Sequence, residues 1–341
     1  MISDAALAAM PRERLAALVK DLKRARQAVI LAHNYQEGPI QEVADFVGDS
    51  LKLAQYAALV EAPVILFCGV HFMAETAAMI CPEKKVLVPD LLAGCSLADM
   101  VVPSQVRQWK QSHPKGVVVC YINTSAVVKA ECDYCCTSSN AIQVIEAIPR
   151  EVEILFVPDY YLGSYVKAKT GRENLHLWKG YCPAHAVINP EEIDHLREAY
   201  PEAEFLMHPE CGCLTKQIDL ADQILSTDGM VQYVKESKAN TFIIATENGI
   251  LYRMRKDNPT KTFIPASPHA GCHHMQRNTL EKVFWSLVRC EFEVTVPQAV
   301  AEPALLPIRR MLEISARSPQ PFPAPVEMLE DWVLEAANDL W

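Results

Sequence analysis

Short apolar runs alternate with amphipathic stretches along most of the chain. Nine of these runs have the length of a strand and are bounded by Gly, Pro, Asp or Asn, so we expect strands at residues 28–35, 63–70, 84–90, 116–123, 152–159, 174–180, 202–210, 241–249 and 261–267. The stretches between them fit helices. Residues 41–60 place apolar side chains on one face, and another helix opens at Asn189 and Pro190, a cap followed by a first-turn proline.

The nine predicted strands fall into a threefold repeat. First strands begin at residues 28, 116 and 202, second strands at 63, 152 and 241, and third strands at 84, 174 and 261, so every spacing lies between 86 and 90 residues. The repeat is visible in this layout and not in residue identity. Strands alternating with helices are typical of a parallel α/β sheet, and a fixed period indicates repeated units.

We therefore expect an α/β fold of three αβα units with parallel sheets, related by a pseudo-threefold axis, with the functional site at their central junction. The predicted units are residues 1–110, 111–197 and 198–290, and residues 291–341 are expected to pack back on the core. Within this last segment, residues 315–325 are rich in Pro and Ser, and residues 326–341 have the pattern of an acidic amphipathic helix.

Composition and charge exclude several classes of function. The 341 residues are 50% hydrophobic, and 32 basic against 42 acidic side chains give a net charge of −10 without a basic run. This argues against nucleic acid and anionic membranes as main partners. No apolar run approaches the ~18 residues of a membrane span. Asp4 stands where a signal peptide would be basic, so we expect a cytoplasmic protein.

The cysteines point to metal or to chemistry. Twelve in 341 residues is well below the ~8–10% that marks a disulfide scaffold. Most are expected to be small buried hydrophobes, as Cys68 and Cys120 inside apolar runs suggest. Each third strand, however, leads into a loop with one cysteine, namely Cys95, Cys182 and Cys272, spaced by 87 and 90 residues.

If equivalent loops converge on the pseudo-threefold axis, three thiolates meet there. Three sulfurs with one open position suit a [4Fe–4S] cluster whose fourth iron can take a substrate oxygen. A three-thiolate zinc site and three unrelated buried cysteines stay open as alternatives. A further alternative is structural zinc or a redox-active pair among the remaining clustered cysteines, Cys132, Cys135, Cys136, Cys211 and Cys213.

Polar residues gather at the predicted strand ends, where open α/β sheets bind their ligands. The first strands finish in His33-Asn34-Tyr35, Tyr121-Ile122-Asn123 and His208-Pro209-Glu210. A hydroxyl follows at a matching place in each unit, from Ser50, Ser138 and Thr227. Beside helix amides such a hydroxyl can bind an anion, although a simple helix cap is the alternative interpretation.

These residues belong to an ordered set of motifs that resembles the quinolinate synthase family over roughly residues 25–315. The motifs include Ala32-His33-Asn34-Tyr35-Gln36, Gly48-Asp49-Ser50, Tyr121-Ile122-Asn123, Cys136-Thr137-Ser138-Ser139-Asn140, Pro158-Asp159-Tyr160, Cys182-Pro183-Ala184-His185, His208-Pro209-Glu210-Cys211 and Ser226-Thr227. The resemblance implies condensation of iminoaspartate with dihydroxyacetone phosphate to quinolinate, with loss of phosphate and two waters, in de novo NAD synthesis. It also implies a [4Fe–4S] cluster on Cys95, Cys182 and Cys272 that acts as a Lewis acid.

The resemblance also implies roles for the strand-end residues. Tyr35, Glu210 and His208 are the expected catalytic groups, because ring closure needs tautomerisation and loss of water, which a positioned phenol and carboxylate assist. The expected substrate-binding residues are His33, Ser50, Tyr121, Ile122, Asn123, Ser138, His208, Pro209, Glu210 and Thr227. His185 either touches substrate or supports the cluster loop.

Two rival functions and one possible partner complete the expectations. A different iron–sulfur hydro-lyase would share the three cysteines without needing dihydroxyacetone phosphate. A non-enzymatic thiolate–zinc module would depend on Cys132, Cys135, Cys211 and Cys213 instead. The resemblance implies a transient contact with L-aspartate oxidase as a source of iminoaspartate. Some family members carry a C-x-x-C before the third ligand, which residues 267–271 of this chain lack.

Overall fold

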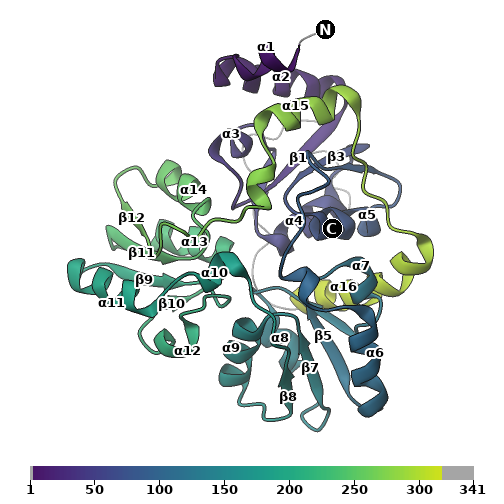
Figure 1. The fold of residues 1–341 in the computed structure, drawn as a ribbon, viewed down its shortest axis with the longest axis vertical. Helices are drawn as coiled ribbons and strands as arrows, with labels where there is room; N and C mark the ends of the chain where they lie inside the picture. Colours follow the sequence, from purple (N-terminus) through teal and green to yellow (C-terminus); the bar gives the residue numbers. More distant parts are fainter. Residues whose placement is uncertain (1–2, 317–341) are drawn as a thin grey trace. The chain divides into compact units, whose positions relative to one another are not determined.

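The computed structural model describes residues 3–316, apart from the side chains of residues 215 and 217, and contains three four-stranded parallel sheets (Figure 1). The first sheet consists of β1 (Ala28–His33), β2 (Phe46–Gly48), β3 (Val64–Cys68) and β4 (Lys85–Leu87). The second consists of β5 (Val117–Tyr121), β6 (Tyr134–Cys136), β7 (Ile154–Val157) and β8 (Leu175–Leu177). The third consists of β9 (Glu204–Met207), β10 (Gln223–Ile224), β11 (Thr241–Ala245) and β12 (Thr262–Pro265). In each sheet the second strand in sequence lies at one edge, followed by the first, the third and the fourth.

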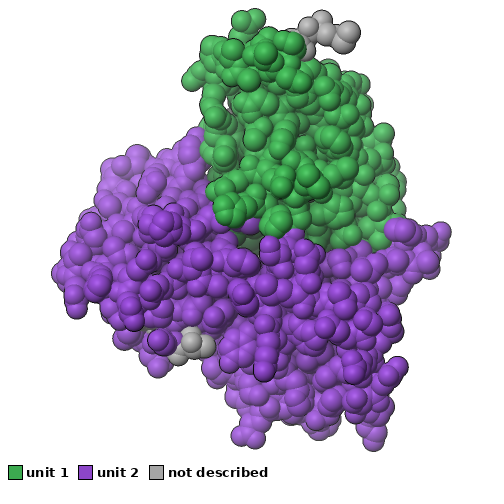
Figure 2. Space-filling model, viewed as in Figure 1, with its two compact units in different colours: residues 1–94, 273–296, 319–341 green, residues 95–272, 297–318 purple. Residues whose placement is uncertain are grey.

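The chain divides into two compact units (Figure 2). Within the described residues, unit 1 is residues 3–94 and 273–296, and it holds the first sheet. Its helices are α1 (Asp4–Ala8), α2 (Arg12–Ala25), α3 (Gly38–Gln41), α4 (Ser50–Leu59), α5 (His71–Ile80), η2 (Met275–Arg277) and α15 (Leu280–Arg289). Helix α15, which the predicted boundary at residue 290 assigns to the third repeat, packs on α2 and β3 in unit 1.

Unit 2 is residues 95–272 and 297–316, and it holds the second and third sheets. With the second sheet lie η1 (Ala98–Met100), α6 (Pro103–Ser112), α7 (Ala126–Lys129), α8 (Ala141–Glu146), α9 (Tyr160–Thr170) and α16 (Gln298–Ala316). The third sheet is accompanied by α10 (Pro183–Ala186), α11 (Pro190–Ala199), α12 (Leu214–Gln217), α13 (Thr227–Glu236) and α14 (Ile250–Asp257). The pseudo-threefold axis and the domain boundaries stay predictions.

All nine predicted strands are present, but the sequence missed three more. These are β2, β6 and β10, each only two or three residues long and each paired with the first strand of its repeat. The predicted helix over residues 41–60 is therefore wrong, since Phe46–Gly48 is a strand and α4 begins at Ser50. A strand of two or three residues has too few positions to show alternation, and β4 and β8, which are equally short, were predicted only as parts of the longer segments 84–90 and 174–180. The Asn189 cap is confirmed, because its side chain accepts a hydrogen bond from the Glu191 N–H.

The repeat extends to residue identity, contrary to expectation. An aspartate stands just before each of the missed edge strands, at Asp45, Asp133 and Asp222, which are 88 and 89 residues apart. Each carboxylate accepts a hydrogen bond from a first-strand N–H at 2.7–2.8 Å, and each backbone N–H of these aspartates returns a bond to the same first-strand residue, namely Ile30, Val118 and Phe205. The three aspartates therefore hold the start of each of these edge strands beside the first strand of its repeat.

A second repeated residue is the cation that precedes or begins each fourth strand. Lys84, Arg172 and Lys261 are 88 and 89 residues apart, and each donates to carbonyl oxygens at the end of the helix that follows the edge strand. These oxygens have no partner inside the helix, and the helix dipole is negative there. The cations therefore join the helix end to the sheet in every repeat.

Arg172→Met is expected to lower the free energy of unfolding by about 2–4 kcal/mol. The Arg172 side chain is buried and donates to the carbonyls of Ile145, Ile148 and Val152 at 2.8–3.0 Å, so its removal leaves buried acceptors without donors. Urea unfolding followed by circular dichroism measures the change. Arg197→Met, in α11, is the control, and an unchanged midpoint for Arg172→Met would contradict the assignment.

Helix α16 packs on β6, α7 and α8. Arg310 donates to the Asp133 carbonyl at 2.6 Å, and Ser315 accepts from the Asn140 amide at 2.8 Å. The predicted Pro- and Ser-rich stretch beyond residue 316 and the predicted helix at 326–341 lie outside the described residues. Among the described helices, none is both long and apolar enough to cross a membrane.

Candidate active site

The three cysteines spaced in step with the repeat all lie in unit 2. Cys95 precedes η1, Cys182 is the residue before α10, and Cys272 follows β12; none of the three is in a disulfide, and all are half-buried. The three are close enough to act electrostatically on one another, and Cys95 and Cys182 also interact with Glu210. Burial raises the pKa of the Cys95 thiol to about 12, and burial together with the charge of Glu210 raises the pKa of Cys182. These thiols therefore stay protonated unless a metal takes the place of the proton.

The spacing of the three sulfurs does not fit one zinc ion. Zinc binds sulfur at about 2.3 Å, so tetrahedral ligands of one ion stand about 3.8 Å apart. Among the described residues, the only groups of three or more metal-capable side chains with ligand atoms within 4.8 Å of one another are His113, Glu153 and His176, and His185, His208 and Glu210. At least one pair of the three sulfurs is therefore more than 4.8 Å apart, which is farther than two sulfur ligands of one zinc ion.

The alternative zinc site on the other cysteines is also unsupported. Cys211 and Cys213 form a disulfide, with sulfurs 2.12 Å apart. Cys132 and Cys135 are buried around β6, at the edge of the second sheet. Neither close group of metal-capable side chains among the described residues contains any of these four. The structure therefore does not support Cys132, Cys135, Cys211 and Cys213 as the four ligands of a structural zinc ion.

Two buried carboxylates, which the sequence reasoning did not select, hold the cysteine loops. Glu247, just beyond β11, accepts from the Cys272 N–H at 3.1 Å and from the Gly249 N–H at 2.7 Å. Asp159, at the equivalent place after β7, accepts from the Leu162 N–H at 2.6 Å and interacts with the Cys182 N–H. Burial raises the pKa of each carboxyl to about 7. The only feature of the sequence that could have identified them is that an acidic residue, Asp159 or Glu247, follows the second predicted strand in two of the three repeats.

Two histidines and a glutamate form a buried group, with His208 and Glu210 just after β9 and His185 in α10. His208 Nδ1 lies 3.3 Å, and His185 Nδ1 3.8 Å, from Oε2 of Glu210. The two imidazoles stack with ring centroids 5.1 Å apart, and His185 Nε2 lies 3.0 Å from the Thr246 hydroxyl. Burial and the charge of Asp159 raise the pKa of Glu210 well above its usual range, although a hydrogen bond with Tyr121 opposes this shift. Glu210 therefore keeps its proton to a higher pH than an exposed carboxyl group does.

The histidine tautomers follow from backbone contacts. His208 Nδ1 accepts from the Glu210 N–H at 3.4 Å, and His33 Nδ1 accepts from the Tyr35 N–H at 3.2 Å. A neutral ring that accepts at Nδ1 carries its hydrogen on Nε2. In His208 that atom lies 3.2 Å from the Ser138 hydroxyl, so the ring spans from the third repeat to the second. Both histidines thus present an N–H donor at a strand end.

The three predicted hydroxyls occupy equivalent places and are not the helix caps. Ser50 and Thr227 are the first residues of α4 and α13, while the preceding Asp49 and Ser226 accept the capping bonds. Ser138 lies in a turn after β6, ahead of the Asn140 that precedes α8, and is therefore not inside a helix as expected. The capping interpretation is thus excluded for Ser50 and Thr227.

The structure brings several predicted residues together in unit 2. Tyr121, Ser138, His208 and Glu210 are linked by the contacts above, and Cys95 and Cys182 lie close to Glu210. Ile122, Asn123 and Pro209 are their chain neighbours, and Thr227 is buried at the start of α13. In unit 1, His33 and Tyr35 meet edge to face at 4.6 Å, and Ser50 begins α4.

Buried acceptors in unit 2 indicate a polar ligand. The amide oxygen of Asn123 and Oε1 of Glu210 are buried without a hydrogen-bond partner among the described residues. Such atoms lose free energy unless a bound group supplies the missing donor. The loop that carries Asn123 is held rigidly, because the buried Lys129 ammonium donates to the Ile122 carbonyl at 2.7 Å and to the Thr124 carbonyl.

Comparison with known proteins agrees with this geometry. A family model described as "Quinolinate synthetase A protein" matches residues 17–313. A quinolinate synthase of Thermus thermophilus is 53% identical over 89% of this chain and 97% of its own. One of Dehalococcoides mccartyi is 49% identical over 89% of this chain and all of its own, and one of Pyrobaculum aerophilum is 51% identical over 86% and 97%. With matches of this extent across both units, the chain belongs to the quinolinate synthetase A family.

Proposed function

We propose that the protein condenses iminoaspartate with dihydroxyacetone phosphate to form quinolinate, with loss of phosphate and two waters, as a step of de novo NAD synthesis. The observation that carries this proposal is that three cysteines outside any disulfide lie near one another in unit 2, beside a buried Glu210–His208–Tyr121 group. Membership of the family supports the activity, and iron–sulfur binding is typical of that family.

Cys95, Cys182 and Cys272 are the proposed ligands of a [4Fe–4S] cluster. Their spacing, their half-burial and the backbone N–H groups that face the sulfurs of Cys95 and Cys182 all support this role, since such N–H groups stabilise thiolates and tune a cluster. When bound through three cysteines, a cluster supplies one open iron as a Lewis acid for dehydration. Asp159 and Glu247 position the Cys182 and Cys272 loops.

The proposed binding residues match the charges of the substrates. Iminoaspartate carries two carboxylates and its co-substrate a phosphate, so the site needs charge-assisted hydrogen-bond donors. The Nε2–H groups of His33 and His208 are such donors. Amides in the first turn of a helix add further donors beside the hydroxyls of Ser50 and Thr227.

The remaining binding residues come from the second and third repeats. We assign the Ser138 and Tyr121 hydroxyls and the Asn123 amide to the dicarboxylate end. Ile122 and Pro209 shape the two strand-end loops that carry them. His185 keeps two possible roles, because it lies beside Glu210 and also follows the Cys182 loop.

Glu210, Tyr35 and His208 are the proposed groups that move protons. Glu210 is buried with a raised pKa, so its carboxylate is a stronger base than an exposed one. His208 can pass or stabilise a proton at the carboxylate, from which its Nδ1 is 3.3 Å away. The Tyr35 phenol is half-buried beside His33 and can donate a proton to a leaving hydroxyl.

Iminoaspartate is unstable in water, which favours a transient contact with L-aspartate oxidase.

Metal analysis of protein purified without oxygen is the first test. We expect about four irons and four acid-labile sulfides per chain, with little zinc. Quinolinate should then form only when iminoaspartate and dihydroxyacetone phosphate are both supplied. Reconstituted protein with a full cluster that turns over without dihydroxyacetone phosphate would favour a different hydro-lyase, and stoichiometric zinc without sulfide would overturn the proposal.

A further inference from the structure

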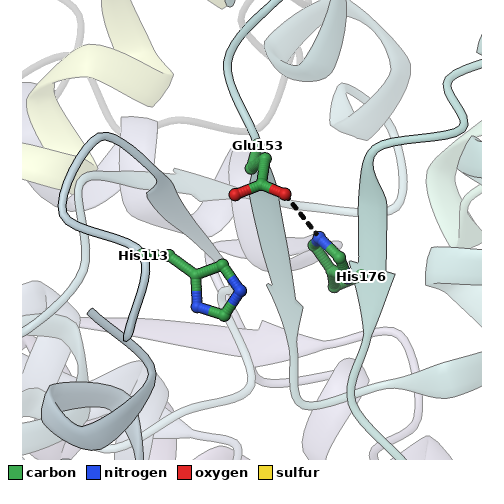
Figure 3. A group of neighbouring side chains, drawn as sticks. All are labelled: His113, Glu153 and His176. Atoms are coloured by element: carbon green, nitrogen blue, oxygen red, sulfur yellow. Dashed lines mark ion pairs between the residues drawn. The ribbon is translucent and has the colours of Figure 1, made fainter. Parts of the chain in front are cut away.

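A second group of metal-capable side chains lies in unit 2, apart from the candidate active site. His113, Glu153 and His176 each offer one ligand atom, and these atoms lie within 4.8 Å of one another (Figure 3). The group sits at the amino ends of β5 and β7, whereas Tyr121 is the last residue of β5 and Asp159 follows the carboxyl end of β7. The group therefore lies at the opposite end of these strands from the candidate active site.

The fold itself brings the three residues together. Glu153 directly precedes β7, and His176 in β8 pairs with Leu155, so Glu153 and His176 point to the same face of the sheet. His113 is the residue at which α6 ends, and α6 packs on the adjacent strand β5. These contacts join residues that are 23 to 63 positions apart in the sequence.

The ring of His113 is held in place and in one tautomer. Its Nδ1 lies 3.0 Å from the Trp109 carbonyl oxygen, which can only accept, so Nδ1 carries the hydrogen and Nε2 keeps a free lone pair. The Trp109 ring stacks on His113 with centroids 4.3 Å apart and an angle of 8°. Figure 3 shows one ring nitrogen of His113 facing the space between the other two side chains. A carbonyl bound to the second nitrogen is the usual support of a metal-ligating histidine.

The other two ligands are close but not bonded to each other. His176 Nε2 stands 3.6 Å from Oε1 of Glu153, which is beyond a good hydrogen bond, and the rings of His113 and His176 are 5.6 Å apart. The side chain of His176 is 44% exposed and that of Glu153 is 48% exposed, so an ion can reach them from solvent. Two imidazoles and one carboxylate suit Zn²⁺ and similar transition-metal ions and leave one position for water, whereas Mg²⁺ and Ca²⁺ prefer oxygen ligands.

We propose that His113, Glu153 and His176 bind a divalent transition-metal ion of the Zn²⁺ type. Bound there, the ion ties the end of α6 to β7 and β8. Because such an ion binds the folded chain better than the unfolded one, it stabilises the second sheet. The site is independent of the iron–sulfur proposal, since it uses none of the same residues.

Zinc titration of the purified protein, with and without substitutions, tests the site. The variants are His113→Ala, Glu153→Gln and His176→Ala, and the matched control is His195→Ala, an exposed histidine on α11. We expect the wild type and the control to bind one zinc more tightly than the three variants, by at least about tenfold. Zinc that binds at cysteines contributes equally to all five proteins and cancels in the comparison.

Thermal melting and NMR complete the test. One equivalent of zinc should raise the melting temperature of the wild type and the control but not of the three variants, which should match the wild type in EDTA. Should a variant fold poorly, histidine ring ¹⁵N shifts of the wild type decide the question. Zinc should move the signals of His113 and His176; unmoved signals, or equal zinc affinity in all five proteins, would overturn the proposal.

Discussion

Replacement of any one of Cys95, Cys182 and Cys272 by alanine is expected to give folded protein without a full cluster and with quinolinate formation reduced by more than about a thousandfold. Each cysteine is the single thiol of its loop, and a cluster that loses one of three protein ligands has no spare thiolate nearby to replace it. Iron and acid-labile sulfide per chain, measured on protein purified without oxygen, together with the rate of quinolinate formation, give the result.

Cys132→Ala is the control for this set. Cys132 is a free buried thiol in unit 2 and lies outside the three loops, so its removal should leave iron, sulfide and activity near wild-type values. Circular dichroism separates loss of the cluster from loss of the fold. A full complement of four irons in any of the three loop variants would remove that cysteine from the ligand set.

Glu210→Gln is expected to lower kcat by about 10²–10⁴-fold while the cluster and the fold are retained. The amide keeps the size of the carboxyl group and replaces a buried side chain whose raised pKa already favours the neutral form, so the cost to stability should be small. What the variant loses is the ability to take up a proton. Glu191→Gln, an exposed glutamate in the first turn of α11, is the matched control.

The pH profile distinguishes a proton-transfer role from a structural one. Burial raises the pKa of Glu210, so its carboxylate forms only as pH rises through that elevated value. If the carboxylate is the base, kcat/KM of the wild type should increase with pH over this range and then level off. This increase of kcat/KM with pH should be absent in Glu210→Gln. A variant with wild-type activity and an unchanged profile would exclude Glu210 as a base.

The contacts of Glu210 explain how a carboxyl group can be buried at this place in unit 2. An isolated charge at this depth would be costly, but Tyr121 hydrogen-bonds to the carboxyl group, and Nδ1 of His208 and of His185 lie 3.3 and 3.8 Å from its Oε2. The same arrangement links the second and third repeats through the contact of His208 with Ser138. The candidate site in unit 2 is thus built from strand ends of more than one repeat.

The sequence alone determined the period of the chain and the chemistry of its strand ends. Most of the nine predicted strands lie in mainly apolar runs, which are visible locally because a strand covered on both faces needs apolar side chains at every position. The spacing of these strands then showed that Cys95, Cys182 and Cys272 recur with the period of the repeat. It also showed that His33, Tyr121 and His208 occupy equivalent positions in the three repeats.

Only the tertiary structure decided the rest, because the remaining features depend on contacts between distant residues. The edge strands β2, β6 and β10 are too short to carry a pattern, and they form because Asp45, Asp133 and Asp222 bond to a neighbouring strand. Glu247 holds the backbone of Cys272 across 25 residues, and His208 meets Ser138 across 70. The group of His113, Glu153 and His176 likewise exists only once α6, β7 and β8 have packed, since three isolated polar residues in a sequence carry no signal of their distance in space.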